Sequence, residues 1–392
     1  MAELYKLKNE IKHYAWGSQS WIPELLGEPN EKKEPWAELW MGIHPGGPSK
    51  TIVQGETRLL SELTGLPFLF KFLAAGSPLS IQAHPNLALA REGFDRENKA
   101  GIPLSADNRN YRDSNHKPEI ICALSPFTAM AGFRERQEAA TLLSLVSGTE
   151  DLCDALKEGY KPFLSRLFGL NAEEKKALNN SVLASARANQ TKNAMVKDSS
   201  PVSLCAELAQ TYPNDPGIVS PLYLNVINLI PYEAIFLPAG ILHAYINGFA
   251  MECMASSDNV LRGGLTSKHI DVQELFSILN FDPFKPDILK PVRTASPGCY
   301  SYKTPCSEFS FYLLQNPVSS VDPALPGGVE LEVPEMGITA VQSGSANITI
   351  SGSVHKTIVL NQGESVFISK RKEGERLHFS GDFTIFAALA PS

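Results

Sequence analysis

Short apolar runs of strand length, separated by Pro, Gly and polar turns, fill both ends of this 392-residue chain. The early runs include PFLFKFLAA at 67–75, PLSIQAHP at 78–85 and EIICALSPF at 119–127. After about residue 325, NITI, KTIVL, ESVFI and FTIFAAL follow one another closely. Strands that recur every 8–12 residues or so, with turns between them, predict a β-sandwich or barrel and not a parallel α/β sheet.

The pattern changes between about residues 135 and 212, where leucines recur at helix-like intervals and β-branched residues are few. Asn171, followed by Ala-Glu-Glu, predicts a helix N-cap with acidic residues in the first turn. Ser200 and Pro201 predict a second N-cap with proline at the first helical position. The turn-rich run TYPNDPG at 211–217 ends this helical stretch, so we expect a mainly β protein with a helical insert.

Two short stretches of the chain echo each other. A turn, a glutamate, a small residue and an apolar strand occur in that order around Glu233 and again around Glu364. If the echo is a true repeat, the chain holds two β-barrels of one type. His243 follows the first glutamate by ten residues, so we expect any chemistry to lie in the first barrel.

Composition and charge narrow the class of protein. Hydrophobic residues make up 43% of the chain and charged residues 20%, which excludes disordered and fibrous classes. Lys and Arg number 35 against 42 Asp and Glu, and a net charge of −7 without a basic stripe argues against a nucleic-acid partner. Six cysteines without a CxxC pair, and the lack of an apolar signal or membrane-length segment, lead us to expect reduced thiols in a cytoplasmic protein.

The sequence SIQAHP at 80–85 is the first cluster that could carry chemistry. In a strand, residues two apart share a face, so Gln82 and His84 would project side by side while Ile81 and Ala83 pack on the other side. Two polar side chains on one face suit a lined interior site. The alternative is an edge strand that exposes both side chains to solvent.

The second cluster, NHKPE, places His116, Lys117 and Glu119 directly before an apolar strand. Lys117 and Glu119 would share one face of an extended segment. The three side chains offer a titratable ring, a cation and a carboxylate. A solvated loop is the alternative.

His243 is the third candidate, in LHAYING. A single histidine in an apolar run is more often a hydrogen-bonded core residue than a ligand. Together with Gln82, His84 and Glu119, however, it completes a mixed nitrogen and oxygen set that suits Zn²⁺. The long separations between these residues fit a catalytic metal in a barrel better than a structural clip.

The fourth cluster is SSDNVLRGGL, with Asp258 and Arg262 four residues apart. It could be an anion clamp or supply a proton-transfer group, and the glycine pair after Arg262 lets the backbone approach a ligand. A surface ion pair at helical spacing is the alternative. The other histidines, His44 among them, have no matched partner in the sequence, and we expect them to be ordinary surface or packing residues.

Six segments together resemble the type I phosphomannose isomerases, in that family's order: HYAWGS (13–18), AELWMGIHP (37–45), PFLFKFLAAGSPLSIQAHPN (67–86), NHKPE (115–119), LPAGILHAYING (237–248) and SSDNVLRGGLTSKHID (256–271). They cover most of the first 130 residues and much of the stretch from 217 to about 285. The resemblance implies a zinc-dependent aldose–ketose isomerase that interconverts mannose 6-phosphate and fructose 6-phosphate.

The resemblance also implies a fold and a set of site residues. The expected fold has two cupin-type jelly-roll barrels and a helical domain: a catalytic domain from 1–134 and 217–290, a helical insert from 135–216 and a C-terminal domain from 291–392. One zinc ion per chain is expected, with the substrate a small sugar phosphate and the chain a monomer. By motif position, the zinc ligands fall on Gln82, His84, Glu119 and His243, the catalytic groups on Arg262, Lys117, Asp258 and His116, and the substrate contacts on Ser80, Lys71, Lys117 and Arg262.

The implied chemistry agrees with the residue types. Two imidazoles, one carboxylate and a neutral amide leave a zinc site with a formal charge of +1, which attracts an anionic enediolate. Lys117 and Arg262 add positive charge for that species or for the phosphate. The base that moves the proton stays open among Asp258, Lys117 and His84. A cupin oxygenase and a sugar-binding cupin without activity are the rival interpretations.

Overall fold

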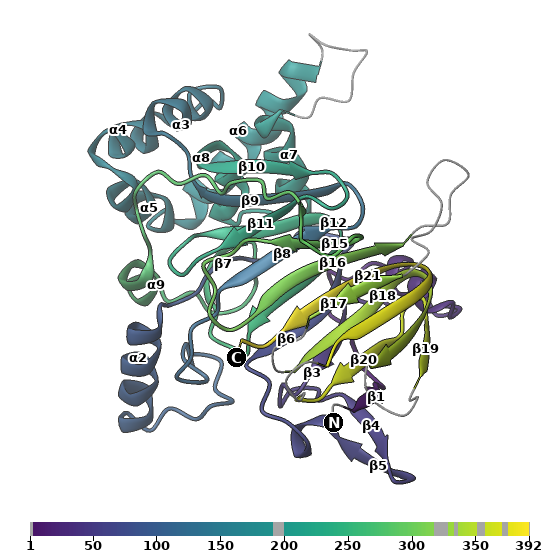
Figure 1. Ribbon diagram of the computed structural model, residues 1–392. Coiled ribbons are helices and arrows are strands. Elements are labelled where there is room, and N and C mark those ends of the chain that lie inside the picture. The colour runs from purple at the N-terminus through teal and green to yellow at the C-terminus, as the bar shows by residue number, and fades with distance from the viewer. Residues whose placement is uncertain are drawn as a thin grey trace.

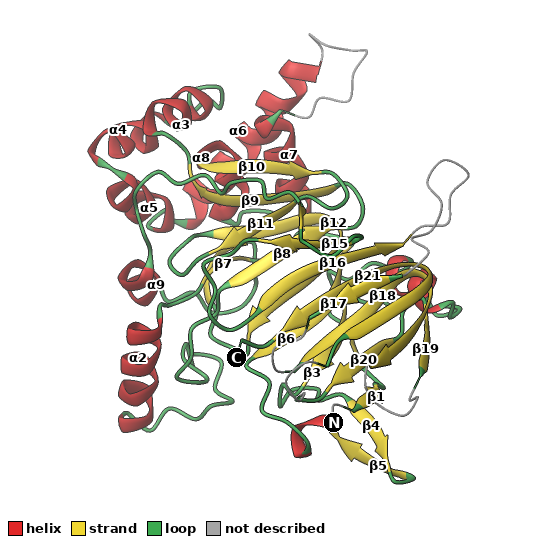
Figure 2. Ribbon diagram, viewed as in Figure 1, coloured by secondary structure: helices red, strands yellow, loops and turns green. Residues whose placement is uncertain are grey.

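Two large antiparallel sheets form most of the molecule, with most of the helices along one side of the first sheet (Figure 1; Figure 2). The structure is a computed structural model and describes residues 3–190, 200–316, 328–332, 336–350, 357–370 and 375–391. Every ladder between its named strands is antiparallel, from the first pair to the last. The prediction of a mainly β protein without a parallel α/β sheet is therefore confirmed.

The first sheet has ten strands, and its main path runs β10-β9-β12-β6-β3-β2. Their bounds are β2 (Glu10–Lys12), β3 (Glu38–Gly42), β6 (Phe68–Ala75), β7 (Ile81–Ala83), β8 (Glu119–Ala123), β9 (Phe127–Phe133), β10 (Leu224–Leu229), β11 (Ala234–Leu237), β12 (His243–Ala255) and β13 (Leu261–Gly264). Strand β7 pairs with both β12 and β13, and β8 pairs with β11 and β12. A separate hairpin joins β4 (Lys50–Val53) to β5 (Glu56–Leu59).

The second sheet contains the C-terminal strands and one strand from the start of the chain. Its members are β1 (Leu4–Lys6), β14 (Val292–Arg293), β15 (Cys299–Tyr302), β16 (Ser310–Asn316), β17 (Val329–Leu331), β18 (Gly337–Ile350), β19 (Ile358–Asn361), β20 (Ser365–Ile368) and β21 (Leu377–Leu389). Strand β1 pairs with β20, so the first described residues complete the C-terminal sheet, which local patterning does not predict.

The helical stretch forms where the leucine pattern placed it. Helices α3 (Arg136–Leu143), α4 (Glu150–Glu158), α5 (Tyr160–Phe168), α6 (Ala172–Gln190), α7 (Pro201–Thr211) and α8 (Ser220–Tyr223) lie together beside β9 and β10 (Figure 2). Both predicted caps are confirmed, because Asn171 Oδ1 accepts the Glu174 N–H at 3.0 Å and the Ser200 side chain accepts the Ser203 N–H. The other helices are α1 (Trp21–Leu26), α2 (Leu87–Lys99) and α9 (Val272–Ile278). Among the described residues, none of the helices is both long and apolar enough to cross a membrane.

Two apolar cores fix the sheets to their neighbours. Phe70 of the first sheet and Phe386 of the second both pack on Phe311, with ring centroids 6.1 and 5.7 Å away. On the other side, Ile81 and Ala83 are fully buried in the core that the helices share. The predicted alternation along β7 is therefore confirmed: its apolar residues support the helices and leave its polar residues facing the opposite way.

The two turns that echo each other in sequence are alike in structure. Tyr232 and Gly363, which precede the two glutamates, have φ values of 72° and 78°. The carboxylate of Glu233 accepts the backbone N–H three residues earlier at 3.3 Å, and the carboxylate of Glu364 does the same at 2.9 Å. The likeness extends to the turn geometry, while the assignment of two jelly-roll barrels stays a prediction. All six cysteines are free, as expected, and four of them are buried.

Strand β12 joins the two halves of the first sheet by turning at Gly248. Residues 243–247 pair with β7 and β9, whereas residues 248–255 pair with β6 and β8. Gly248 has φ +133°, and a Cβ there would lie 2.6 Å from the Phe127 ring and 2.8 Å from the Phe127 Cα. Glycine is required because a side chain would meet both an unfavourable backbone conformation and a backbone clash.

This requirement predicts that Gly248→Ala is strongly destabilising. The left-handed backbone costs about 1–2 kcal/mol and the clash a further 1–3 kcal/mol or so. Gly55→Ala is the matched control, since Gly55 has φ +87° but no atom within 4 Å of an added Cβ. Chemical denaturation of both variants measures the difference. Equal losses of unfolding free energy would show that the contact with Phe127 does not matter.

Candidate metal centre and active-site cleft

A cleft of about 590 Å³ opens over the first sheet. Seven of the residues singled out in the sequence line it: Lys71, Ser80, Gln82, Lys117, Glu119, Asp258 and Arg262. They come from β6, β7, β8, β13 and the loops that flank these strands. The sheet therefore brings together residues that lie up to 191 positions apart in the chain, between Lys71 and Arg262.

His84, Glu119 and His243 form a buried group with the geometry of a metal site. Their candidate ligand atoms all lie within 4.8 Å of one another. His84 Nε2 is 3.5 Å from one Glu119 oxygen, and His243 Nε2 is 3.4 Å from the other. The exposed fractions of the three residues are 2%, 1% and 1%. This excludes the solvent-exposed edge strand and the solvated loop for the residues concerned.

The tautomers of both histidines are set by backbone oxygens. His84 Nδ1 lies 2.7 Å from the Asn259 carbonyl oxygen, and His243 Nδ1 lies 2.8 Å from that of Ile241. A carbonyl can only accept, so each Nδ1 carries the proton and each Nε2 presents a lone pair. Neither Nε2 has a hydrogen-bond partner among the described residues. A satisfied core histidine is therefore not what the structure shows at His243; two aligned lone pairs next to a carboxylate fit a cation.

Gln82 lies directly beside this group. It is the cross-strand partner of His243 on one side and of Arg262 on the other. Its side chain is half-buried and faces the cleft, while its neighbours in β7 face the helical core. The amide oxygen is thus available from the strand that already supplies His84.

Charge governs the protonation of the buried group. Burial raises the pKa of Glu119, but the charge of the Lys117 ammonium opposes burial, and the pKa lies well below its usual range. Lys117 Nζ lies 3.0 Å from Glu119 Oε1. Burial lowers the pKa of His84 to about 4 in spite of the Glu119 carboxylate. A charged carboxylate and a neutral imidazole are the forms that bind metals.

Lys71 belongs to a second buried network. Its ammonium lies 2.9 Å from Glu38 Oε1 and 2.7 Å from Glu252 Oε2. The Tyr245 hydroxyl donates to Glu252 Oε1 at 2.9 Å and lies 3.5 Å from Glu119 Oε2. Although burial opposes the charged form, the two carboxylates raise the pKa of Lys71. The network therefore connects a cation in the cleft wall to the Glu119 carboxylate of the candidate metal site.

Asp258 is paired with His44 and not with Arg262. His44 Nδ1 accepts the Gly46 N–H at 3.2 Å, so its Nε2–H faces Asp258 Oδ1 at 3.3 Å. Burial raises the pKa of Asp258, but the hydrogen bond from His44 outweighs burial and leaves the pKa below its usual value. The expectation that His44 is an ordinary residue is wrong, because it lines the cleft and orients a candidate catalytic group. Its place in the AELWMGIHP segment was the available signal.

The structure does not bring His116 to the cleft. Its ring is hydrogen-bonded to the Glu308 carboxylate, from the loop between β15 and β16, and it is not among the residues that line the cleft. The Cys306 thiol also donates a hydrogen bond to Glu308 Oε2 at 3.1 Å. The segment that carries Lys117 is thus held from outside by the C-terminal part of the chain.

Sequence reasoning missed three further cations that line the cleft, Arg109, Arg112 and Lys268, of which Arg109 is paired with Glu97. Burial and the charge of Arg112 lower the pKa of Arg262. Burial, Arg262 and Arg112 lower the pKa of Lys268. Three like charges therefore face one region of the cleft. Lys268 lies in a segment that resembles the family, whereas no local pattern marks Arg112.

The Lys117–Glu119 contact predicts a measurable coupling in the metal-free protein. Lys117→Met and Glu119→Gln should each be destabilising by several kcal/mol, on the order of 3, because each leaves a buried charge without its partner. The double variant should lose less than the sum, with a coupling of about 1–3 kcal/mol. Denaturant unfolding of the four proteins after chelation measures this cycle. Additive losses would mean that the two charges do not interact.

Comparison with known proteins points to the family that the sequence motifs resemble. Residues 4–136 match the catalytic domain of phosphomannose isomerase type I. The mannose-6-phosphate isomerase of Salmonella typhimurium is 41% identical over 332 residues, 79% of this chain and 83% of the relative. The human mannose-6-phosphate isomerase is 31% identical over 437 residues, 98% of each chain. The crystal structure of the Salmonella mannose 6-phosphate isomerase bound to its substrate fructose 6-phosphate and to zinc has a TM-score of 0.85 and 34% identity, and covers 99% of this chain and 100% of that one. This chain belongs to the type I phosphomannose isomerase family.

Proposed function

We propose that this chain is a zinc-dependent isomerase that interconverts mannose 6-phosphate and fructose 6-phosphate. The observation that carries the proposal is the pair of unpartnered Nε2 lone pairs of His84 and His243, which converge with Glu119 beside a cation-lined cleft. The substrates come from the names of the relatives and from the fructose 6-phosphate bound to the Salmonella enzyme.

The residues present fit zinc. His84, His243 and Glu119 supply two imidazole nitrogens and a carboxylate, and Gln82 would complete a set of four. The backbone carbonyls on each Nδ1 hold the rings in the ligating orientation. Bound zinc would act as a Lewis acid that stabilises the negative charge developing on a sugar oxygen. Because Gln82 is neutral, the site keeps a net positive charge for that purpose.

The chain's own residues would move the protons. Conversion of the aldose to the ketose removes the proton from C2, gives an enediol and returns a proton to C1, while the O2 hydroxyl proton passes to O1. Asp258 and Lys117 are the proposed proton-transfer groups, because both line the cleft. Asp258 is held ionised by His44. His84 is not proposed as the base, since its lone pair faces the metal group.

The cations would hold the anionic parts of the substrate. Arg262 lies across from Gln82, and its charge would stabilise the enediolate. Arg112, Lys268 and the Ser80 hydroxyl line the same cleft and would receive the phosphate. Lys71 is assigned to the cleft wall near the sugar hydroxyls. His116 is placed outside the mechanism as a group that fixes the segment next to Lys117.

The finer description of the fold is part of the same proposal. Cupin-type jelly rolls would account for the antiparallel order of both sheets, and the division at 1–134 with 217–290, 135–216 and 291–392 follows the change from strands to helices and back. Strand β1 would then cross from the first domain into the C-terminal sheet. The six free thiols support a reducing, cytoplasmic compartment. The monomeric state stays a prediction.

Removal of the metal is the first test. We expect conversion of mannose 6-phosphate to fructose 6-phosphate to stop after chelation and to return with added zinc. His243→Ala should lose both activity and bound zinc, whereas His269→Ala should keep both, since His269 is exposed and lies outside the metal group. Activity is followed by a coupled assay and zinc by elemental analysis. Full activity in the metal-free protein would refute the zinc assignment, and no activity in folded, zinc-loaded protein would favour a sugar-binding protein.

The proton-transfer groups predict a second result. Lys117→Met and Asp258→Asn should each lower kcat by a factor of about 10²–10⁴, the usual contribution of a general acid or base, with zinc content unchanged. Reaction in D₂O should place deuterium on the product carbon in the wild type, and the variant that lacks the base should lose this exchange. Near-normal turnover in either variant would remove that residue from the mechanism.

A further inference from the structure

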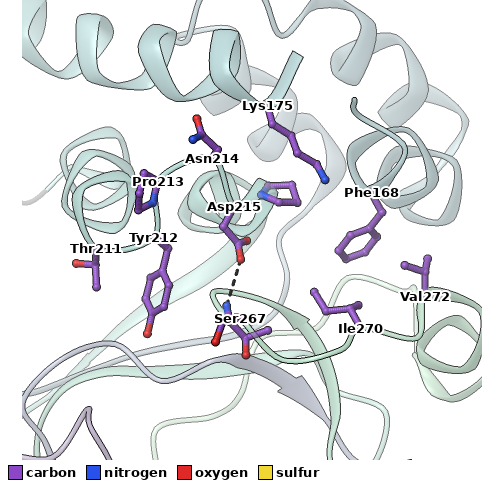
Figure 3. Close-up of a pocket in the computed structure, with 12 residues that line it drawn as sticks. Phe168, Lys175, Thr211, Tyr212, Pro213, Asn214, Asp215, Ser267, Ile270 and Val272 are labelled. Carbon is purple, nitrogen blue, oxygen red and sulfur yellow. Dashed lines mark hydrogen bonds between the residues drawn. The ribbon is translucent and has the colours of Figure 1, made fainter. Parts of the chain in front are cut away.

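The loop after β13 lies between two cavities. One is the active-site cleft, and the other is a cavity of about 530 Å³ on the helical side, shown in Figure 3. Tyr212, Thr266 and Ser267 line both. Arg262 lies in β13, two residues before the end of that strand, and the loop spans 265–268 and ends at Lys268. The loop therefore separates the two cavities, with one cleft cation in the strand before it and another at its end.

The loop needs an external anchor. Arg262 lowers the pKa of Lys268, and Arg112 lowers the pKa of both, so the three positive charges repel one another. Leu265 has φ +52° although it is not glycine, and this backbone conformation is unfavourable for a branched side chain. Repulsion and backbone strain both favour a different course for the chain, so other contacts must hold it.

Asp215 provides that anchor from the far side of the loop. Its Oδ2 accepts the Thr266 N–H at 3.1 Å, and its Oδ1 accepts the Gly217 N–H at 2.7 Å. In Figure 3 the Asp215 carboxylate points to the loop that carries Ser267. Glycine at position 217 lets the two backbone segments approach closely, because a Cβ there would lie 3.0 Å from the Leu265 nitrogen. One carboxylate thus ties the end of the helical stretch to the cleft loop.

A second tether comes from the same segment. The Tyr212 hydroxyl donates to the Pro78 carbonyl at 2.7 Å, two residues before Ser80 of the cleft. The segment 212–217, which follows α7, therefore holds two loops of the cleft wall. The Asp215 contact acts on the loop with Lys268, and the Tyr212 contact on the loop with Ser80.

We propose that Asp215 is a positioning residue for phosphate recognition: by accepting the Thr266 N–H it holds the 265–268 loop so that Lys268 faces the substrate's phosphate. This inference rests on the proposed function. Asp215 does not line the cleft and touches no reacting group, so its loss should weaken the binding of the phosphate more than it slows the chemical step.

The test compares Asp215→Ala, Asp215→Asn and Tyr212→Phe with the wild type, all as zinc-loaded full chains. We expect Asp215→Ala to raise KM for mannose 6-phosphate about tenfold, the loss expected for one hydrogen bond to a charged group, while kcat stays within a factor of about three. Asp215→Asn keeps an acceptor for one N–H, so about a threefold rise is expected. Tyr212→Phe keeps the ring packing and should raise KM about threefold through the Ser80 loop.

Glu364→Gln is the matched control. The Glu364 carboxylate also accepts a backbone N–H and pairs with Lys6 at 2.6 Å, but it lies in the C-terminal sheet region, away from the cleft lining. It should leave KM unchanged. Titration calorimetry with inorganic phosphate gives a readout that does not require turnover, and the Kd should rise with KM in the Asp215 variants.

The outcomes separate the two proposals. An inactive wild type would overturn the proposed function, while the phosphate titration would still test Asp215. Unchanged KM and phosphate Kd in folded Asp215→Ala, or in Asp215→Asn if the alanine variant does not fold, would overturn the positioning role. A loss of kcat and of bound zinc in step with a lower Tm would show a merely structural contact and would also overturn it.

Discussion

The burial of one carboxylate, that of Glu119, sets the requirements for the rest of the site. An unpaired buried charge costs several kcal/mol, so the surrounding structure has to supply positive charge or hydrogen-bond donors. Lys117 supplies an ammonium at 3.0 Å, and the Tyr245 hydroxyl approaches from behind. The two histidines do not satisfy it, because their Nδ1 protons face backbone carbonyls. A cation between the Glu119 carboxylate and the two Nε2 lone pairs would therefore satisfy all three groups.

Strand β12 explains how a sheet can build this group. Its first half carries His243 beside Gln82, and its second half carries Glu252 opposite Lys71. The turn at Gly248 lets one strand serve both halves of the sheet, and Tyr245 spans the distance between them through its hydrogen bond to Glu252. One candidate metal ligand and two members of the Lys71 network thus lie on a single strand, which resists the small displacements that would spoil their geometry.

Local sequence patterns predict those features that depend on neighbouring residues. The two helix caps, the alternation along β7 and the approach of Lys117 to Glu119 all follow from spacing, and the structure has them. The resemblance to a family added the assignment of roles. Contacts between distant parts of the chain left no pattern in the local sequence. Three examples are the pairings of β1 with β20, of His44 with Asp258 and of Asp215 with Thr266. Residue type alone cannot show that a turn aspartate lies behind a cleft.

A chain with net charge −7 that receives a phosphate dianion must concentrate cations locally, and concentrated cations repel one another. At the candidate metal site, the buried charge of Glu119 is balanced by Lys117, two residues away in the same segment.

On the proposed phosphate side, a carboxylate paired with the cations would cancel their attraction for the substrate. The 265–268 loop therefore has to be held by hydrogen bonds to its backbone, made on the side that faces away from the cleft. Asp215 fits that need because its carboxylate accepts two N–H groups of the backbone rather than pairing with Arg262 or Lys268. This contact would also explain the position at which the helical insert ends. The segment that follows α7 carries Asp215, which holds the loop after β13 where the sheet provides no support.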